Sequence, residues 1–190
     1  MKYLVVFAHP YSKSFNNAIV DTIKEEVINN GAEIEIRDLY NIGFDPVLKG
    51  SDLLNLRDKN YANDIRIEQE YVKWADIIIF VYPVWWAGLP AMLKGYVDRV
   101  FANGFAFIDG ENGPSGLLNG KKALLISTTG FPSDIYEEIG MHKSMKQTVD
   151  QGIFEFCGIE VENHIFLGAV PTSSRETLVD YLKEVREAIN

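Results

Sequence analysis

Short apolar runs and helix-like segments alternate along the chain. Residues 2–8 and 76–82 are almost continuously apolar, residues 123–126 form the apolar centre of the segment 121–128, and each segment is followed by turn-forming residues. This pattern is typical of strands that are buried on both faces of a sheet. Residues 32–40 alternate apolar and charged side chains, which indicates a strand near a sheet edge. A fifth strand is predicted over residues 160–169.

Helices are predicted between these strands. Ser14 is placed to cap the first helix, Gly31 to end it, and Pro90 to begin the third. Strand and helix alternate five times, so we predict one α/β domain over residues 1–190, with an open parallel sheet covered on both faces. The predicted helices cover residues 15–30, a segment ending near 74, 90–101, 143–157 and 174–189, and the predicted loops cover 41–60, 103–119 and 129–136.

Charge and cysteine content narrow the class of protein. Acidic residues outnumber basic ones 27 to 18, which gives a net charge of −9. This charge disfavours a general nucleic-acid binder or a protein of anionic membrane surfaces, although local backbone dipoles can still hold a small anion. Cys157 is the one cysteine, so an internal disulfide is excluded. A short apolar N-terminal run without signal-peptide features predicts a cytoplasmic location.

Ligands of open α/β sheets bind beyond the carboxyl ends of the strands. The first apolar strand leads into residues 8–16, just before a helix N-terminus, where an anion can bind. This loop contains neither GxGxxG nor GxxxxGK[ST]. It offers His9, Ser12, Ser14 and Asn16 instead. These side chains fit a terminal phosphate, and a simple helix cap and turn is the alternative explanation.

The second loop contains the adjacent Trp85 and Trp86. Neighbouring side chains of an extended chain point in opposite directions, so one core cannot take both indoles. They can form the wall of a site for a flat aromatic ligand; alternatively, one packs on the core and the other covers a helix or a subunit interface. The third loop, STTGF over residues 127–131, adds hydroxyl and N–H groups. Together the three loops fit the phosphate, ring and ring edge of flavin mononucleotide.

Several long motifs resemble the flavodoxin-like NAD(P)H:quinone oxidoreductases, both the DT-diaphorase type and smaller bacterial relatives that include the ancillary reductase of a potassium-efflux system. The resemblance covers residues 3–168, and Tyr136 and His142 have the family's spacing. It implies a flavodoxin-like sheet of strand order 2-1-3-4-5 and a homodimer. The matching segments are AHPYSKSFNNA, DLYNIGFDPVL, ADIIIFVYPVWWAGLPAMLKGYVDRVFANGFAF and ISTTG.

The resemblance also implies roles for individual residues. The flavin phosphate and ribityl chain would be held by His9, Ser14, Phe15, Asn16 and Asn17. The isoalloxazine ring would lie along Pro83, Val84, Trp85 and Trp86, with its pyrimidine edge on Thr128, Thr129 and Gly130. The nicotinamide and quinone pocket, at the subunit interface, would be lined by Phe105 and Phe107.

Two positions depart from the family pattern. Trp85 stands where the family commonly has Gln, so any contact there must come from the backbone. Phe131 stands where a second Gly is common, and its bulk can narrow the substrate pocket or change the acceptors that fit. The absence of the long C-terminal extension of the DT-diaphorase type favours FMN, with FAD as the alternative.

The implied reaction is a two-electron, ping-pong reduction. NADPH or NADH gives a hydride to the flavin and leaves, and a quinone or other aromatic acceptor then takes the electrons. Negative charge develops at flavin N1 and O2, where His142 and Tyr136 would supply protons. On one unbroken helix these side chains would point about 120° apart. They can converge only if the helix breaks, and Gly140 lies at a suitable place.

Other polar residues have simpler interpretations. His164, on a predicted strand, is expected to be structural, and Lys94, Asp98 and Arg99 are expected to form a solvated or interface face. The scattered histidines argue against a metal site. Two alternatives to the enzyme remain: a flavodoxin-like electron carrier, which the acidic charge would suit, and a regulatory reductase subunit of a potassium-efflux transporter.

Overall fold

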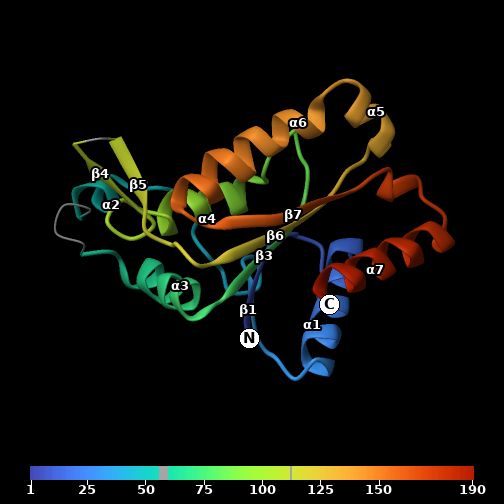
Figure 1. Cartoon of the computed structure of the whole chain (residues 1–190), viewed down its shortest axis with the longest axis horizontal. Coiled ribbons are helices and arrows are strands. Elements are labelled where there is room, and N and C mark those ends of the chain that lie inside the picture. The colour runs from blue at the N-terminus through green and yellow to red at the C-terminus, as the bar shows by residue number, and fades with distance from the viewer. Residues whose placement is uncertain (56–59, 112) are drawn as a thin grey trace.

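Five parallel strands form a central sheet in the computed structural model, which describes residues 1–55, 60–111 and 113–190 (Figure 1). The spatial order is β2-β1-β3-β6-β7. Numbered among themselves, these strands have the predicted order 2-1-3-4-5, which confirms the flavodoxin-like topology. Their bounds are β1 (Lys2–Phe7), β2 (Glu33–Asp38), β3 (Ile77–Pro83), β6 (Lys122–Thr128) and β7 (Glu160–Leu167).

Helices cover both faces of the sheet, as the sequence predicts. Helices α1 (Phe15–Asn29) and α7 (Arg175–Ile189) pack together on one face (Figure 1). The other face is covered by α3 (Asn63–Trp74), α4 (Ala91–Val100) and the π-helix η1 (Gln147–Phe154). The short elements are α2 (Gly50–Asn55), α5 (Ser133–Glu138), α6 (Met141–Lys146) and the 3₁₀ turns η2 (Glu155–Cys157) and η3 (Val170–Thr172).

The two hydrophobic cores explain why the central strands are apolar throughout. In β1, Val5 and Phe7 pack with the α1 and α7 side chains. Leu4 and Val6, which point the opposite way, pack with α3 and α4. Alternate residues of a strand face opposite sides, so a strand with helices on both sides needs apolar residues at every position.

Three segments that were predicted as loops contain regular structure. Helix α2 lies within residues 41–60, of which 56–59 fall outside the described residues, and α5 begins within 129–136, at Ser133, and runs to Glu138. Residues 103–119 contain an antiparallel hairpin of β4 (Phe107–Gly110) and β5 (Gly113–Gly116), with residue 112 outside the description. The predicted helix over 143–157 begins earlier, at Met141, and widens into the π-helix η1.

The glycines of residues 103–119 indicated a loop, but one of them, Gly116, allows β5 to lie close to the backbone of η2. A Cβ on Gly116 would lie 2.3 Å from the Cys157 carbonyl carbon and 2.3 Å from the Gly158 nitrogen. Only a residue without a side chain allows the strand to approach η2 this closely. The same glycine content that indicated a loop therefore permits the strand to pack.

The prediction of a solvated or interface face for Lys94, Asp98 and Arg99 is wrong for Arg99. Lys94 and Asp98 form an exposed ion pair, but Arg99 is buried and pairs with Asp52 and Asp64 at 3.0 and 2.6 Å. One step along a helix turns the side chain by about 100°, which carries Arg99 from the exposed face towards α2 and α3. Within the described residues, no helix has both the length and the apolar character needed to cross a bilayer.

Candidate active site

Three loops follow neighbouring strands at the same edge of the sheet. Strand β3 pairs with β1 on one side and with β6 on the other, so the segments after Phe7, Pro83 and Thr128 emerge side by side. The Val84 N–H donates to the Thr128 carbonyl at 2.8 Å, which joins the second loop to the third. The edge predicted from strand order is therefore where these loops meet.

The first loop ends in a capped helix, as the sequence predicts. Ser14 has extended backbone angles, and its hydroxyl accepts the Asn17 N–H at 3.2 Å. His9 accepts the Tyr11 N–H at Nδ1, 3.0 Å away, which leaves the proton of a neutral ring on Nε2. Burial lowers the pKa of His9 and so favours that neutral ring. Its ring centre lies 6.2 Å from that of Trp85, so the first two loops are in contact.

Not every predicted residue of the first loop presents its side chain to a ligand. Phe15 packs against Tyr181 of α7, with ring centres 6.4 Å apart. The Asn17 amide donates to Asp21 at 3.2 Å. Asn16 is 2% exposed and bonded to Thr128. Contacts from these three positions to a ligand would therefore have to use mainly backbone groups.

The two tryptophans lie at the tip of a tight turn. Trp85 and Gly88 exchange two backbone hydrogen bonds of 3.2 Å, and Trp86 and Ala87 between them have φ angles of 52° and 57°. This left-handed conformation costs about 1–2 kcal/mol for a residue with a side chain, and such strain is concentrated at functional sites. Trp86 is fully exposed and Trp85 is 42% exposed. Neither indole packs in the core, which removes one alternative explanation for the pair.

The third loop uses its hydroxyl groups internally. Thr128 Oγ1 lies 2.9 Å from Asn16 Oδ1 and 3.1 Å from Asn16 Nδ2, and Thr129 Oγ1 donates to the Phe131 carbonyl at 2.7 Å. A ligand at this loop would therefore contact backbone groups, of which those of the exposed Gly130 are the most accessible. The contact of Thr128, Thr129 and Gly130 with a ring edge stays a prediction.

Tyr136 and His142 are brought together as predicted. Helix α5 ends before Gly140, whose φ of 74° is left-handed, and α6 then begins at Met141. The ring centres of Tyr136 and His142 lie 6.0 Å apart at an angle of 79°. The break at Gly140 is therefore confirmed, whereas the catalytic role of the pair stays a prediction.

His142 has an unusual hydrogen-bond environment. Its Nδ1 lies 2.9 Å from the carboxylate of Glu137, and its ring stacks on Phe166 at 4.1 Å. The residue is 7% exposed, and its Nε2 has no partner among the described residues. An unpaired buried polar atom costs about 1–3 kcal/mol, so this nitrogen is a candidate for a ligand contact. Neither Glu137 nor Phe166 was predicted; Glu137, five positions before His142, was the one visible signal.

Phe131 covers part of the same cluster. Its ring stacks on Tyr136 with centres 5.7 Å apart and planes 11° apart, and it is 57% exposed. Its carbonyl accepts the Ala169 N–H at 2.8 Å in addition to the Thr129 hydroxyl. The side chain therefore extends from a fixed backbone position next to Tyr136.

Two predicted pocket residues lie apart from the three loops within the chain. Phe105 is 9% exposed and belongs to the core on the α3 and α4 side. Phe107 begins the hairpin and packs on Phe156 at 5.1 Å. In a single chain these residues are not joined to the cluster of Trp86 and Tyr136, so their role in a substrate pocket stays a prediction.

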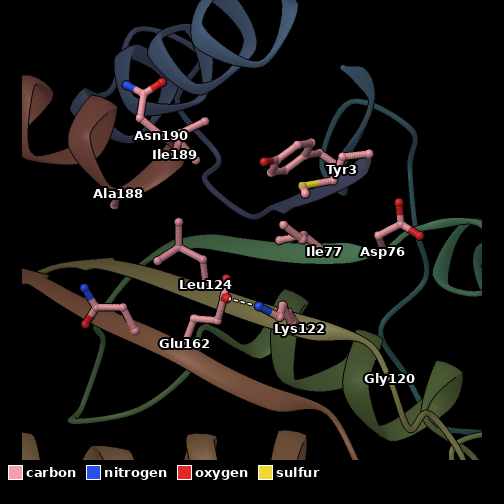
Figure 2. A pocket seen from close by; sticks show the side chains of 12 residues that line it. Tyr3, Asp76, Ile77, Gly120, Lys122, Leu124, Glu162, Ala188, Ile189 and Asn190 are labelled. Carbon is pink, nitrogen blue, oxygen red and sulfur yellow. Dashed lines mark hydrogen bonds and ion pairs between the residues drawn. The ribbon is translucent and has the colours of Figure 1, made fainter. Parts of the chain in front are cut away.

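A cavity of about 800 Å³ lies at the opposite edge of the sheet (Figure 2). Its lining includes Tyr3, Asp76 and the Lys122–Glu162 ion pair, all at the amino ends of strands. None of the predicted site residues lines it. Because ligands of this architecture bind at the carboxyl ends, the loop cluster is the better candidate despite the size of this cavity.

Comparison with known proteins agrees with the geometry. The family model of the flavodoxin-like fold matches residues 1–189. An uncharacterized NAD(P)H oxidoreductase of Haemophilus influenzae is 38% identical over 99% of this chain and 95% of its own length. Human ribosyldihydronicotinamide dehydrogenase (quinone) is 33% identical over 84% of this chain and 78% of its own.

Solved structures give the same result. An NAD(P)H:quinone oxidoreductase from Methanothermobacter marburgensis matches with a TM-score of 0.88 and 27% identity, over 100% of this chain and 95% of that one. An FMN-dependent NADH-azoreductase of Bacillus anthracis, solved with FMN, shares the fold at a TM-score of 0.73 and 23% identity, over 99% of this chain and 97% of that one. The chain thus belongs to the flavodoxin-like family, among its NAD(P)H oxidoreductases and quinone reductases.

Proposed function

We propose that the protein is a flavin-dependent NAD(P)H oxidoreductase that transfers two electrons to quinones or similar flat aromatic acceptors. The observation that carries this proposal is the state of His142, a buried histidine beside Tyr136 with one nitrogen fixed by Glu137 and the other without a partner among the described residues. Family membership supports the same reaction class.

The first loop has the groups that a flavin phosphate needs. The neutral His9 ring carries a donor at Nε2, and the Ser14 hydroxyl can still donate while accepting the Asn17 N–H. Both precede helix α1, whose N-terminus favours an anion. These donors fit one terminal phosphate, so we propose FMN as the flavin and FAD as the alternative.

The second and third loops would enclose the ring. Trp85 and Trp86 offer large apolar surfaces at the carboxyl edge of the sheet, and such walls exclude water from a flat ligand. Because the hydroxyls of Thr128 and Thr129 are bonded internally, they hold the loop in place. The loop backbone is then preorganised to contact a ring edge.

His142 and Tyr136 would handle charge and protons. When bound, a flavin supplies the redox chemistry by accepting a hydride from NAD(P)H and passing two electrons to the acceptor. Glu137 accepts the Nδ1 proton of His142, so the second nitrogen can either accept a hydrogen bond or, once protonated, donate one to developing negative charge. The Tyr136 hydroxyl lies on a ring packed edge-on to His142 and could relay a proton.

A short series of measurements tests the function. The protein would be purified, its flavin released by denaturation and its mass measured to separate FMN from FAD. Anaerobic NADPH or NADH should then bleach the bound flavin, and a quinone should restore its colour. Parallel double-reciprocal plots would support a ping-pong order. Protein that contains no flavin and takes up neither FMN nor FAD would overturn the proposal.

A homodimer is part of the proposal. Phe105 and Phe107 do not reach the loop cluster of their own chain, whereas the exposed Trp86, Phe131 and Ile139 leave apolar surface beside it. A second copy could supply the missing wall. Light scattering on the eluting protein would give twice the monomer mass of 21.5 kDa, and a monomeric active enzyme would contradict this part.

An electron carrier is the second candidate, because the net charge of −9 would suit docking to a basic redox partner. The bleaching experiment separates the two. A carrier would hold flavin that NAD(P)H alone does not reduce, whereas the enzyme would be reduced without a partner protein.

A further inference from the structure

Three aromatic rings are stacked beside the candidate site. Phe166 lies between His142 and His164, with ring centres 4.1 and 4.0 Å away and interplanar angles of 15° and 21°. His164 and Phe166 are two residues apart on β7, so their side chains share one face of the strand. His142 comes from α6. The stack therefore joins the edge strand to the helix that carries the candidate catalytic histidine.

His164, at the end of the stack away from His142, is held by buried hydrogen bonds. His164 is 5% exposed; its Nδ1 lies 2.7 Å from Asp150 of the π-helix η1, and its Nε2 lies 3.2 Å from the Tyr82 hydroxyl. The Asp150 carboxylate only accepts, so a neutral His164 carries its single ring proton on Nδ1, facing Asp150. The bare Nε2 then accepts from the Tyr82 hydroxyl, which keeps its proton because burial raises the pKa of Tyr82.

The neutral form of His164 agrees with its surroundings. Burial lowers its pKa, and this effect exceeds the opposing effect of Asp150. Ser127 Oγ lies 3.3 Å from the same Nε2 and provides a second possible donor. With both nitrogens bonded, the His164 ring has a fixed plane, and that plane backs Phe166.

His142, at the other end of the stack, has weaker hydrogen-bond restraints than His164. Glu137, the partner of His142 Nδ1, has a side chain that is 76% exposed, so this bond competes with water. No residue in the described part of the chain pairs with the other nitrogen of His142, so rotation of the ring would allow it to find a new partner. The face of Phe166 opposes that rotation because a turned ring would lose the parallel stacking.

We infer that Phe166 and His164 are positioning residues, which hold the His142 ring so that Nδ1 stays on Glu137 and Nε2 stays free for a ligand. The effect on catalysis rests on the proposed function of His142. The effect on the ring itself does not, since it can be measured in the protein without substrate.

Nitrogen NMR of the imidazole rings tests the inference directly. The chain has three histidines, and the signals of His142 would be assigned from their loss in H142Q. At a pH at which the spectrum shows a neutral ring, the wild type should show His142 with its proton on Nδ1 and a bare Nε2. Phe166→Leu should give a mixture of the two neutral tautomers, and Phe166→Tyr, which keeps the aromatic face, should restore the wild-type signals.

Two further variants keep the test interpretable. His164→Gln retains groups that can bond Asp150 and Tyr82 but removes the ring behind Phe166, so it should shift His142 in the same direction as Phe166→Leu. Phe44→Leu makes the same chemical change at a core site beside Tyr96 and should leave the His142 signals unchanged. If Phe166→Leu and His164→Gln both keep the wild-type tautomer, the inference is wrong.

Kinetics separate this inference from the proposed function. In Phe166→Leu, kcat should fall about ten- to a hundredfold with KM within about twofold, because small displacements of a catalytic group cost rate more than binding. A changed tautomer in a protein without reductase activity would refute the proposed function and support the positioning role. An unchanged tautomer in an active enzyme would refute the positioning role and support the proposed function.

Discussion

Asn16 and Thr128, which are 112 residues apart in sequence, share a buried side-chain hydrogen bond with Thr128 Oγ1 2.9 Å from Asn16 Oδ1. This bond ties the start of α1 to the end of β6, and with the Val84–Thr128 backbone bond it joins all three loops of the candidate site. Contacts within the fold therefore hold the three loops of the candidate site together.

Removal of this bond should destabilise the protein. Thr128→Val keeps the shape of the side chain but leaves the Asn16 amide buried without its partner. The free energy of unfolding should fall by about 1–3 kcal/mol, as measured by urea denaturation. Thr148→Val, which removes an exposed hydroxyl bonded to its own helix, is the matched control and should stay within about 0.5 kcal/mol.

Trp86 should contribute to flavin affinity and not to the stability of the fold. Trp86→Ala removes a fully exposed indole and keeps the left-handed backbone strained, so the unfolding free energy should change by less than about 0.5 kcal/mol. Flavin affinity, followed by fluorescence quenching, should weaken severalfold because aromatic stacking contributes about 0.5–1.5 kcal/mol.

Trp86→Gly separates the strain from the indole. Glycine adopts positive φ freely, so this variant should be more stable than Trp86→Ala by about 1 kcal/mol while binding flavin equally weakly. Equal flavin affinity in the wild type and both variants would exclude Trp86 from the ring site.

Loss of the His142 side chain should slow the reaction. His142→Gln should lower kcat about a hundredfold or more, the usual contribution of a positioned acid or base. Glu137→Gln should give a smaller loss, because it keeps a polar partner for Nδ1 but removes the charge. Glu138→Gln changes an exposed neighbour in the same way and should behave as wild type. Steady-state kinetics with a soluble quinone measures all three, and an unaffected kcat in His142→Gln would remove this residue from the mechanism.

Phe131 should control which acceptors fit. Its ring covers Tyr136, so Phe131→Gly opens space beside the candidate catalytic pair. The ratio of kcat/KM for a bulky quinone to that for a small one should rise about tenfold, a usual effect of changing pocket volume. Phe131→Tyr, which keeps the ring, should preserve the wild-type ratio. The same rise in both variants would show that the phenyl ring is not the barrier.

The buried Arg99–Asp52 pair should make the free energy of unfolding depend on pH in the acidic range. Burial opposes the charge of Asp52, but hydrogen bonds from Arg99 and the Lys49 amide outweigh it and lower the pKa of the carboxyl. A lowered folded-state pKa stabilises the protein above the unfolded-state pKa, and this stabilisation is lost as pH falls through the folded-state value.

Urea midpoints between about pH 7 and pH 3 provide the measurement for this pair. Asp52→Asn should be less stable than the wild type at neutral pH, since it leaves a buried guanidinium without one partner, and should lose less stability on acidification. Parallel pH profiles of the two proteins would contradict the assignment.

The sheet and the edge at which the three loops meet could be predicted because their signals are local. Strands β1 and β3 carry an apolar residue at nearly every position and β6 does so over residues 123–126, which is typical of strands with a hydrophobic core on each face. The break between Tyr136 and His142 could be predicted because Gly140 and the helical period are both visible in the chain. In each case, residues close in sequence determine the outcome.

The rest depends on three-dimensional neighbours. The pairing of Glu137 with His142 requires the turn angle at Gly140, and the pairing of Asp150 with His164 requires a π-helix that apolar periodicity does not indicate. The sequence does not predict the burial of Arg99, because its carboxylate partners come from α2 and α3, more than thirty residues away. Distant partners of this kind leave no pattern in a single sequence.

Gly140 has one further consequence. A Cβ there would meet no atom of the described residues within 4 Å, yet the φ of 74° strains a residue that has a side chain. Substitution at this position is therefore limited by a torsion angle and not by space. Gly140→Ala should lower the free energy of unfolding by about 1–2 kcal/mol and alter how α6 follows α5, without a steric clash with the described residues.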